Sequence, residues 1–563
     1  MIEEVTPWML TILVLLVTGL TPVLTLLLSA LLLWRYRRVV IRQMAVSGGF
    51  DEPLMEAHAA TASREDGAPS DPTDGAELFR HAVRGPWQIA LRYAGAGLAF
   101  ALVFAVAASF VYPYTLGPLS YLLAIWVYSW PVVPALLLIV PASWHIRIAY
   151  FGAYFAVFLL IVLWAGTVLD IPGSRFGAIE LPARSSSTPS AMLKLWLVIN
   201  GAPTLLILLC FNRWVRAVAP LVLVLVTMVL CGVVAGYLGL SLKIGFEATV
   251  AAAVALEVHP GWLVLGIVLL FLVAFAAIGW LLTRWIASAY RRGTVSDQSL
   301  TLDALWLLFA SYYGMWLVLG GLLWAATAVV AFAFFKLALA LTRRLAPRAP
   351  QATRGLTFLR VFSLGRRSER LLDTVAKYWR YVGSVQMITG PDVAHSTVQP
   401  HQFLDFLSRK LTSHFVRDAS SLARSVAESV RTADSDGRYS VNSFFCQADS
   451  WQRALPLLVQ RDDVVLMDLR SFSPTNAGCI HELQHLVGNV PLDRCLFIVD
   501  GTTDNAFLES TLREAWQDLP PDSPNRHRSP DETPLNRLGS GAAALRAVVE
   551  RLCNAGALSV AVR

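Results

Sequence analysis

The chain has 563 residues, of which 56% are hydrophobic and 15% are charged, and its mean hydropathy is +0.55. Soluble proteins contain roughly 45–50% apolar and about 25% charged residues, so this composition excludes a wholly soluble protein. The formal net charge of +7 does not indicate a nucleic-acid partner, because the Lys and Arg residues stand mostly at the ends of apolar segments, as membrane orientation requires.

Apolar segments long enough to cross a bilayer fill the first 345 residues. A transmembrane helix needs about 20 mostly apolar residues, because its backbone amides must be paired within the helix itself. The last segment is about twice that length, and Gly320 with Gly321 divides it into two spans. The sequence therefore predicts nine transmembrane helices in a domain covering residues 1–345, near residues 9–34, 88–112, 119–140, 148–169, 193–211, 218–241, 261–283 and, as two spans, 301–341.

Basic residues follow every odd-numbered predicted span. Cytoplasmic loops carry the excess of Lys and Arg, so the N-terminus is expected outside the cell and the C-terminal residues in the cytoplasm. We expect the bacterial inner (plasma) membrane as the location, and a flexible cytoplasmic linker over residues 43–86, which are rich in Ala, Gly, Pro and Ser. The basic residues are Arg35, Arg37, Arg38, Arg42, His145, Arg147, Arg213, Arg216, Arg284, Arg291, Arg292, Arg343 and Arg344.

Few ionisable residues fall inside the predicted spans. Such residues are costly in lipid and usually mark a substrate or ion path. Asp303 and Glu257 fall at a span end and in the 243–260 connection, which is expected to lie along the outer interface. The helix breaks at Pro131 and Asn200 fit either a cavity or simple kinks. A transporter or channel with a regulatory α/β domain is therefore an alternative function.

From about residue 353, short apolar segments alternate with amphipathic ones. Because strands that alternate with helices pair in parallel through right-handed crossovers, we expect residues 353–563 to form an α/β domain with a mainly parallel, doubly wound sheet. The multi-span α-helical membrane domain precedes it. Strands are predicted at 356–363, 384–389, 463–469 and 493–499, helices at 366–382, 400–416 and 449–460, and a closing strand in the segment ALSVAV near the C-terminus.

Polar residues follow the predicted strands of this domain. Ligands of doubly wound sheets bind at the carboxyl ends of the strands, so these residues are the candidates for ligand contact. No GxGxxG or Walker motif is present, which excludes a conventional dinucleotide or P-loop site. The residues expected to contact a ligand are Ser363, Gly365, Arg366, Asp468, Ser471 and Ser473.

Two segments of the domain carry a family resemblance. The segment DVVLMDLRSFSPTNAGCIHELQHL at 463–486 resembles the central part of a TIR domain, in which an apolar strand precedes a Ser-containing loop, a Cys and a Glu-Leu pair on a helix. The segment LRVFSLGRRSER at 359–370 is similar to the first strand and loop of that family. The resemblance implies NAD as ligand or substrate, with Glu482 as the catalytic residue at the nicotinamide ribose, and self-association through the domain. It implies a membrane-anchored signalling or defence-type effector.

Two alternatives use the same residues differently. In a flavodoxin-like sheet without NAD cleavage, Glu482 only caps or solvates a helix. The letters HELQH also spell the HExxH pattern of a membrane zinc peptidase, with His481 and His485 as metal ligands, Glu482 as base, and a third ligand from Glu509 or Glu514. The motif follows a strand and a loop and occupies the first turns of a helix, which favours an α/β sheet over a zinc site.

Overall fold

The computed structural model divides into two compact units, each of which is considered by itself. Unit 1 comprises Met1–Leu32 and Ile89–Pro347, and unit 2 comprises Leu33–Gln88 and Arg348–Arg563. The structure describes residues 7–45, 74–112, 118–168, 174–181, 189–210, 218–344, 354–361, 366–389, 403, 406–408, 411 and 415–561, without 142, 177–178, 242, 293, 430–431, 447–449 and 540.

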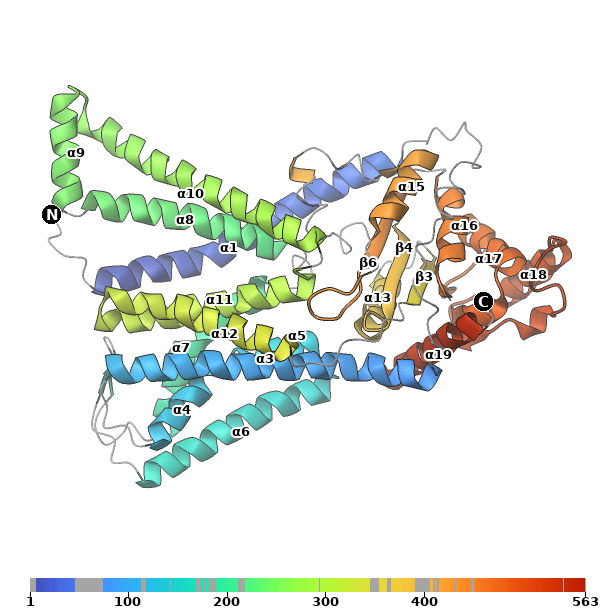
Figure 1. Ribbon diagram of the computed structural model, residues 1–563, viewed down its shortest axis with the longest axis horizontal. Coiled ribbons are helices and arrows are strands. Elements are labelled where there is room, and N and C mark those ends of the chain that lie inside the picture. Colours follow the sequence, from blue (N-terminus) through green and yellow to red (C-terminus); the bar gives the residue numbers. More distant parts are fainter. Residues whose placement is uncertain are drawn as a thin grey trace. The chain divides into compact units, whose positions relative to one another are not determined.

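Unit 1 is a bundle of helices (Figure 1). Two helices, α1 and α3, begin or end in unit 2, and a short antiparallel pair, β1 (Ser174–Phe176) with β2 (Ile179–Leu181), follows α6. The helices are α1 (Pro7–Met44), α3 (Gly75–Val111), α4 (Pro118–Tyr128), α5 (Val132–Ile139), α6 (Trp144–Val168), α7 (Pro189–Cys210), α8 (Ala219–Ser241), α9 (Lys243–Ala255), α10 (Pro260–Arg291), α11 (Asp297–Leu317), η1 (Val318–Gly320), η2 (Leu322–Ala326) and α12 (Thr327–Arg344).

Six helical segments among the described residues are long and apolar enough to cross a bilayer. The described apolar parts of α7, α8 and α9 are shorter than these. Several helices could thus cross a membrane, while their insertion, the count of nine and their orientation remain predictions. The six segments are Gly19–Met44, Gly75–Val111, Tyr121–Ile139, Trp144–Trp164, Pro260–Ala289 and Leu323–Arg344.

The long apolar stretch 301–341 is divided at the predicted glycines. Gly321 has a φ of +133°, a backbone conformation that residues other than glycine rarely adopt. Two short 3₁₀ segments, η1 and η2, separate α11 from α12 there. The two helices then pack closely, since the rings of Trp306 and Phe335 lie 4.7 Å apart. Asp303 forms an ion pair of 2.7 Å with Lys336 of α12, so its carboxylate is paired within unit 1.

Helix α9 links α8 to α10 and lies across their ends (Figure 1). It occupies most of the 243–260 connection, which was expected not to cross the membrane. Its 13 residues span about 20 Å at 1.5 Å per residue, which is too short for a hydrocarbon core of about 30 Å. Helices α8 and α10 pack through glycine: a Cβ on Gly232 would lie 2.9 Å from the carbonyl oxygen of Phe271.

Unit 2 contains a sheet of seven strands, all paired in parallel. The strand order is β5-β6-β4-β3-β7-β8-β9, which confirms the expected parallel α/β fold. The strands are β3 (Arg354–Arg360), β4 (Gly383–Thr389), β5 (Phe415–Val416), β6 (Val441–Cys446), β7 (Val464–Asp468), β8 (Cys495–Val499) and β9 (Leu535–Arg537). The helices are α13 (Arg366–Trp379), α15 (Ala419–Glu428), α16 (Trp451–Arg461), α17 (Ala477–Asn489), η5 (Leu492–Arg494), α18 (Asn505–Gln517), η6 (Pro530–Glu532) and α19 (Ala542–Ala561).

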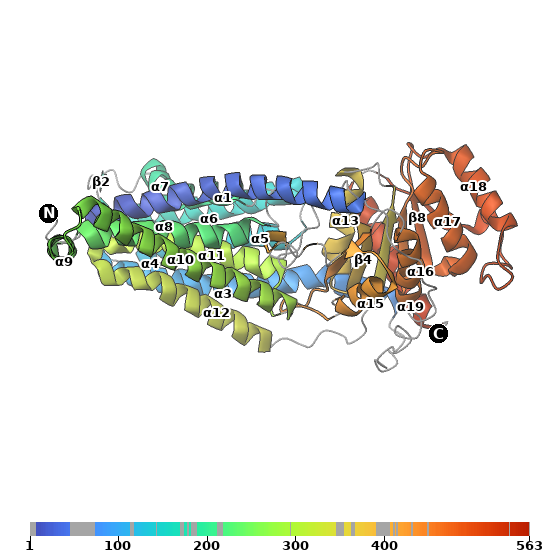
Figure 2. The ribbon, with the colours of Figure 1, turned by 90° about the horizontal axis from the view of Figure 1, so that it is seen from above.

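Hydrophobic cores form on both faces of the sheet. Figure 2 shows the ribbon of the strands and of the helices beside them. The first core joins the sheet to α15, α16, α17 and α18, and the second core joins it to α13 and α19. Strand β3 contributes Leu359 to the first core and Phe358 to the second, because successive side chains of a strand point to opposite faces. A central strand must therefore be apolar on both faces, which explains the continuous apolar sequences of β7 and β8.

Three expectations about unit 2 need correction. Residues 75–86 were predicted as linker, but they form the start of α3, and Leu78 and Ala82 lie in the second core. The ALSVAV segment was expected to be a strand, yet its described residues continue α19, which ends at Ala561. The helix predicted at 400–416 falls mostly outside the described residues: Phe403, Phe406 and Leu407 are helical as expected, but its last two residues form β5. Local sequence could not reveal these features, because each depends on packing against distant residues.

Candidate functional site

The carboxyl ends of β3 and β7 form the point at which the strand order reverses. The chain passes from β3 to β4 on one side of the sheet and later places β7 on the other side of β3. Ligands of open α/β sheets bind in the crevice beyond such a reversal. Arg360 and Asp468 are register partners at this edge, so the residues that follow them define the candidate site.

A buried carboxylate at the end of β7 organises the site. Asp468 has no exposed surface, and it accepts hydrogen bonds from Nε and Nη2 of Arg470, both of 2.7 Å. Ser368 Oγ of α13 donates a third hydrogen bond, also of 2.7 Å. Arg470 Nη2 donates in addition to the Arg367 carbonyl oxygen at 3.0 Å. Asp468, expected to contact a ligand, is therefore engaged in orienting Arg470.

Arg470 keeps one nitrogen available. Its Nε and Nη2 groups are used by Asp468 and the Arg367 carbonyl, but its Nη1 group has no hydrogen-bond partner within the described part of the chain. A guanidinium that is held on one edge presents its other edge in a fixed direction, which suits a carboxylate or phosphate ligand. The pair thus provides a preorganised cationic donor.

A second charged pair joins α13 to the end of β8. Arg367 Nη2 lies 2.5 Å from Asp500 Oδ2, and the backbone N–H of Thr502 donates to Asp500 Oδ1 at 2.9 Å. Burial raises the pKa of Asp500, but the hydrogen bonds from Thr502 and the charge of Arg367 outweigh it, so that this pKa lies below its usual range. The carboxylate is therefore ionised at neutral pH and tethers Arg367 beside the site.

The loop after β7 presents hydroxyl groups beside these pairs. Ser471 has a φ of +57°, an uncommon conformation for a residue with a side chain, and its Oγ lies 3.0 Å from Thr502 Oγ1. The Ser473 and Thr475 hydroxyls lie 2.9 Å apart. The fully buried Phe472 between them anchors the loop, because its carbonyl oxygen accepts from the backbone N–H of Asp504.

Glu482 is not on this exposed rim. It lies on α17 with only 1% of its surface exposed, near Arg360 and Cys479, and its Oε2 atom has no hydrogen-bond partner among the described residues. Burial raises the pKa of Glu482 to about 8, against the opposing effects of Arg360 and Cys479. In this conformation the carboxyl group is protonated at neutral pH and does not reach solvent.

The other predicted ligand residues can be placed only in part. Ser363 and Gly365 lie outside the described residues, and Arg366 is the first residue of α13, with a side chain that is likewise outside them. Ser471 and Ser473 lie in the same loop as Arg470. Sequence reasoning identified the strand ends but did not single out Arg470, Arg367 or Thr502. The available sequence signal was Arg470, which stands two positions after Asp468 at the end of a predicted strand.

The HELQH residues do not converge as zinc ligands. His481 is exposed with its ring edge-on to Trp451, and Asn489 contacts the half-buried His485, whereas Glu482 points into the protein. Burial, with a smaller contribution from His481, lowers the pKa of His485. Within the described ranges, no group of three or more His, Cys, Asp or Glu side chains could hold a metal ion.

Asn200 of α7 forms hydrogen bonds at the point where α4 ends. The carbonyl of Val127, freed where α4 ends, accepts from the fully buried Asn200 Nδ2 at 3.3 Å. Asn200 Oδ1 accepts from the Tyr313 hydroxyl at 2.5 Å. The break before α5 is therefore stabilised by helix packing, whereas the break expected at Asn200 is absent, because α7 is helical throughout Pro189–Cys210.

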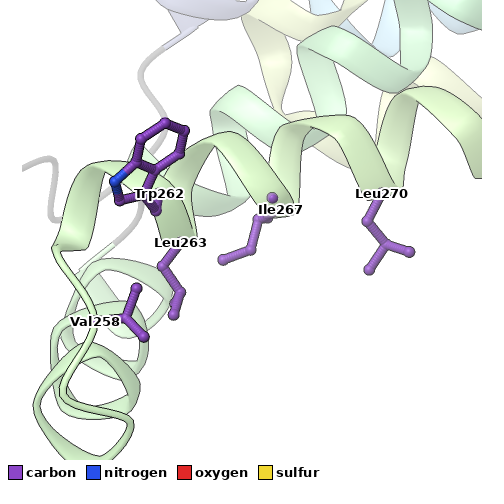
Figure 3. Close-up of a pocket in the computed structure, with 6 residues that line it drawn as sticks. Val258, Trp262, Leu263, Ile267 and Leu270 are labelled. Carbon is purple, nitrogen blue, oxygen red and sulfur yellow. The ribbon is translucent and has the colours of Figure 1, made fainter.

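An open hollow beside the start of α10 is apolar (Figure 3). Ligand pockets usually combine apolar walls with a few placed polar groups. No charged side chain contributes to this hollow, so it does not suggest a site for a polar solute. Its lining residues are Val258, Trp262, Leu263, Gly266, Ile267 and Leu270.

No protein-family model, curated protein or solved structure matches this chain. The fold and the site define its class: a protein with several long apolar helices and a parallel α/β unit, in which two arginine–aspartate pairs lie at the carboxyl ends of the strands.

Proposed function

We propose that this protein is a membrane-anchored signalling or defence-type effector whose cytoplasmic, TIR-like α/β domain binds a nucleotide at the carboxyl edge of β3 and β7. One observation carries the proposal: Arg470 is fixed by Asp468 at the reversal point of the sheet and keeps its Nη1 group available. NAD is the nucleotide to test first, because the 463–486 segment resembles the corresponding part of TIR domains.

The chemistry of the rim supports a nucleotide. The Nη1 group of Arg470 can donate to phosphate oxygens. The Thr502 and Ser473 hydroxyls donate to Asp500 Oδ1 and Asn476 Oδ1, so their oxygens can accept from ribose hydroxyls. The two carboxylates at the edge are already paired with arginines, so they add no uncompensated negative charge that would repel an anionic ligand.

Cleavage of NAD is the second part of the proposal. An ionised Glu482 would stabilise the positive charge that develops on the ribose when nicotinamide leaves. Because the carboxyl group is buried and protonated in this conformation, cleavage requires that α17 or the loop before it open and that Glu482 ionise. Self-association of the domain is a suitable trigger, and a second copy of the chain is then the partner.

Binding is tested with the full chain in lipid nanodiscs, by calorimetric titration with NAD. Arg470→Lys keeps the charge but loses the two-point contact with Asp468, so it should weaken NAD binding about tenfold or more. Arg513→Lys on α18 is the matched control, because Arg513 is 65% exposed and pairs only with its helical neighbour Glu509. Equal affinities of both variants and the parent chain would overturn the proposed site.

Cleavage is tested by following nicotinamide release, with and without crowding of the protein on the membrane. The parent chain should release nicotinamide when crowded, and Glu482→Gln should not, although it should still bind NAD. Binding without release in any condition would leave a nucleotide-binding module and remove the enzymatic part of the proposal.

A further inference from the structure

One helix of unit 2 contacts the candidate site at its first turn. In α13, Ser368 donates to the buried Asp468 and Arg367 pairs with Asp500. The carbonyl of Arg367 also accepts from Arg470, whose free nitrogen is the proposed ligand donor. A displacement of this turn would therefore change the position of Arg470.

The remaining turns of α13 share a hydrophobic core with the start of α3. Leu371, Val375 and Trp379 belong to the second core, together with Leu78 and Ala82 of α3. Leu78 is 4% exposed and Ala82 has no exposed surface, so both residues are buried in this core. The same helix thus contacts the site at one end and contributes to the core that holds the start of α3.

The fit of α3 in unit 2 leaves no free space at two glycines. A Cβ on Gly85 would lie 2.5 Å from the ring of Tyr381, which follows α13 by two residues. A Cβ on Gly75 would lie 2.3 Å from Asn554 Oδ1 of α19. Only glycine fits at these two positions, so the start of α3 packs closely against Tyr381 and α19, and a shift of α3 toward Tyr381 would displace the turn that follows α13.

We infer that α13 couples the position of Gly75–Gln88 of α3 to the carboxyl-edge site, so that α3 regulates ligand binding there. The identity of the ligand rests on the proposed function, whereas the coupling concerns the protein alone. Helix α3 continues without interruption to Val111 as one of the apolar candidate spans. A displacement of α3 along its axis would therefore move Leu78 and Ala82 within the second core of unit 2.

Two glycine substitutions on the same helix test the coupling without a ligand. Gly85→Ala inserts a methyl group against Tyr381, while Gly95→Ala meets nothing within 4 Å. Hydrogen–deuterium exchange of the full chain in nanodiscs should show about tenfold faster exchange for Gly85→Ala at residues 366–370 and 469–476, because overpacking shifts local opening equilibria. Gly95→Ala should exchange as the parent chain does. Faster exchange confined to the residues around Tyr381 would overturn the inference.

If Gly85→Ala fails to fold, a pair of cavity variants replaces it. Leu78→Ala removes a buried side chain from the second core, and Leu512→Ala removes a similarly buried one from the first core. Only Leu78→Ala should accelerate exchange at residues 366–370. Equal acceleration by both would mean general destabilisation and would overturn the coupling.

Repeating the exchange experiment with NAD separates this inference from the proposed function. NAD added to the parent chain should slow exchange at residues 75–88 as well as at the site. Coupling in the variants without any effect of NAD would retain the inference and reject NAD as the ligand. Protection by NAD that stops at the site would retain the ligand and reject the coupling.

Discussion

Arg470 and Asp468 form a buried ion pair at the carboxyl end of β7. Arg470 Nη2 lies 2.7 Å from Asp468 Oδ2, and the two side chains are 8% and 0% exposed. The two residues are only two positions apart, yet Ser368, a hundred positions away in the sequence, completes the shell of the carboxylate. The pair therefore ties the loop after β7 to the first turn of α13, and its loss should affect both stability and ligand binding.

Asp468→Asn should destabilise unit 2 strongly. The substitution leaves a buried guanidinium without its counter-charge, which costs about 3–5 kcal/mol. Pulse proteolysis of the full chain in increasing urea, read at the C-terminal fragments, measures the loss. The control is Glu509→Gln, which removes an exposed ion pair with Arg513 worth less than about 1 kcal/mol. Equal effects of the two substitutions would contradict the role assigned to Asp468.

Glu482→Gln should stabilise unit 2 increasingly as the pH rises. The folded pKa of Glu482 is about 8 against an ordinary value of 4.5, so the unfolded chain loses this proton first and the parent loses stability between those pH values. Glutamine has the same shape and does not titrate. Unfolding in urea at pH 5 and pH 8 should show a larger advantage for the variant at pH 8. A pH-independent difference would contradict a protonated, buried carboxyl group.

Asn200→Leu should weaken unit 1. It removes the side-chain donor to the Val127 carbonyl and leaves the Tyr313 hydroxyl without its acceptor in an apolar interior, at a cost of about 1–3 kcal/mol. The fraction of protein that remains soluble in detergent after heating, measured by size-exclusion chromatography, should fall at a lower temperature. Leu208→Ala on the same helix is the control, because Leu208 is 68% exposed. An unchanged transition for Asn200→Leu would mean that the hydrogen bonds do not stabilise the helix break.

A fragment of residues 353–563 should not form a stable domain by itself. It lacks Leu78 and Ala82, so the surface of Trp379 and Leu552 in the second core would be exposed to water. The fragment should bind the dye ANS and aggregate, and fusion of residues 74–88 through a flexible linker should abolish both. A monomeric fragment with a cooperative thermal transition and no dye binding would show that the α3 segment is dispensable.

The C-terminus should face the cytoplasm, because basic residues follow the odd-numbered predicted spans. A tag after Arg563 should be cleaved by protease in intact cells only once the membrane is permeabilised. A tag at the N-terminus should be accessible without permeabilisation. The reverse pattern would invert the proposed orientation and remove a cytoplasmic ligand such as NAD.

The sequence by itself determined the two-part character of the chain and the central strands of the sheet. Composition required extensive apolar helices. Strands β7 and β8 could be predicted because a strand buried on both faces is continuously apolar, and β3 and β4 because they are short, mainly apolar segments that alternate with amphipathic ones. Gly320 and Gly321 likewise marked the break between α11 and α12, because a positive φ favours glycine. These features depend on interactions within a few residues, so local sequence contains them.

Only the tertiary structure decided which polar residues act together. The short edge strands β5 and β9 carry weak local signals and exist because a neighbouring strand pairs with them. Leu78 joined the α/β core, and Glu482 became a buried, protonated group instead of an exposed one, through contacts with residues far away in the chain. Burial and electrostatic environment are set by which distant segments come together, and no local pattern specifies that.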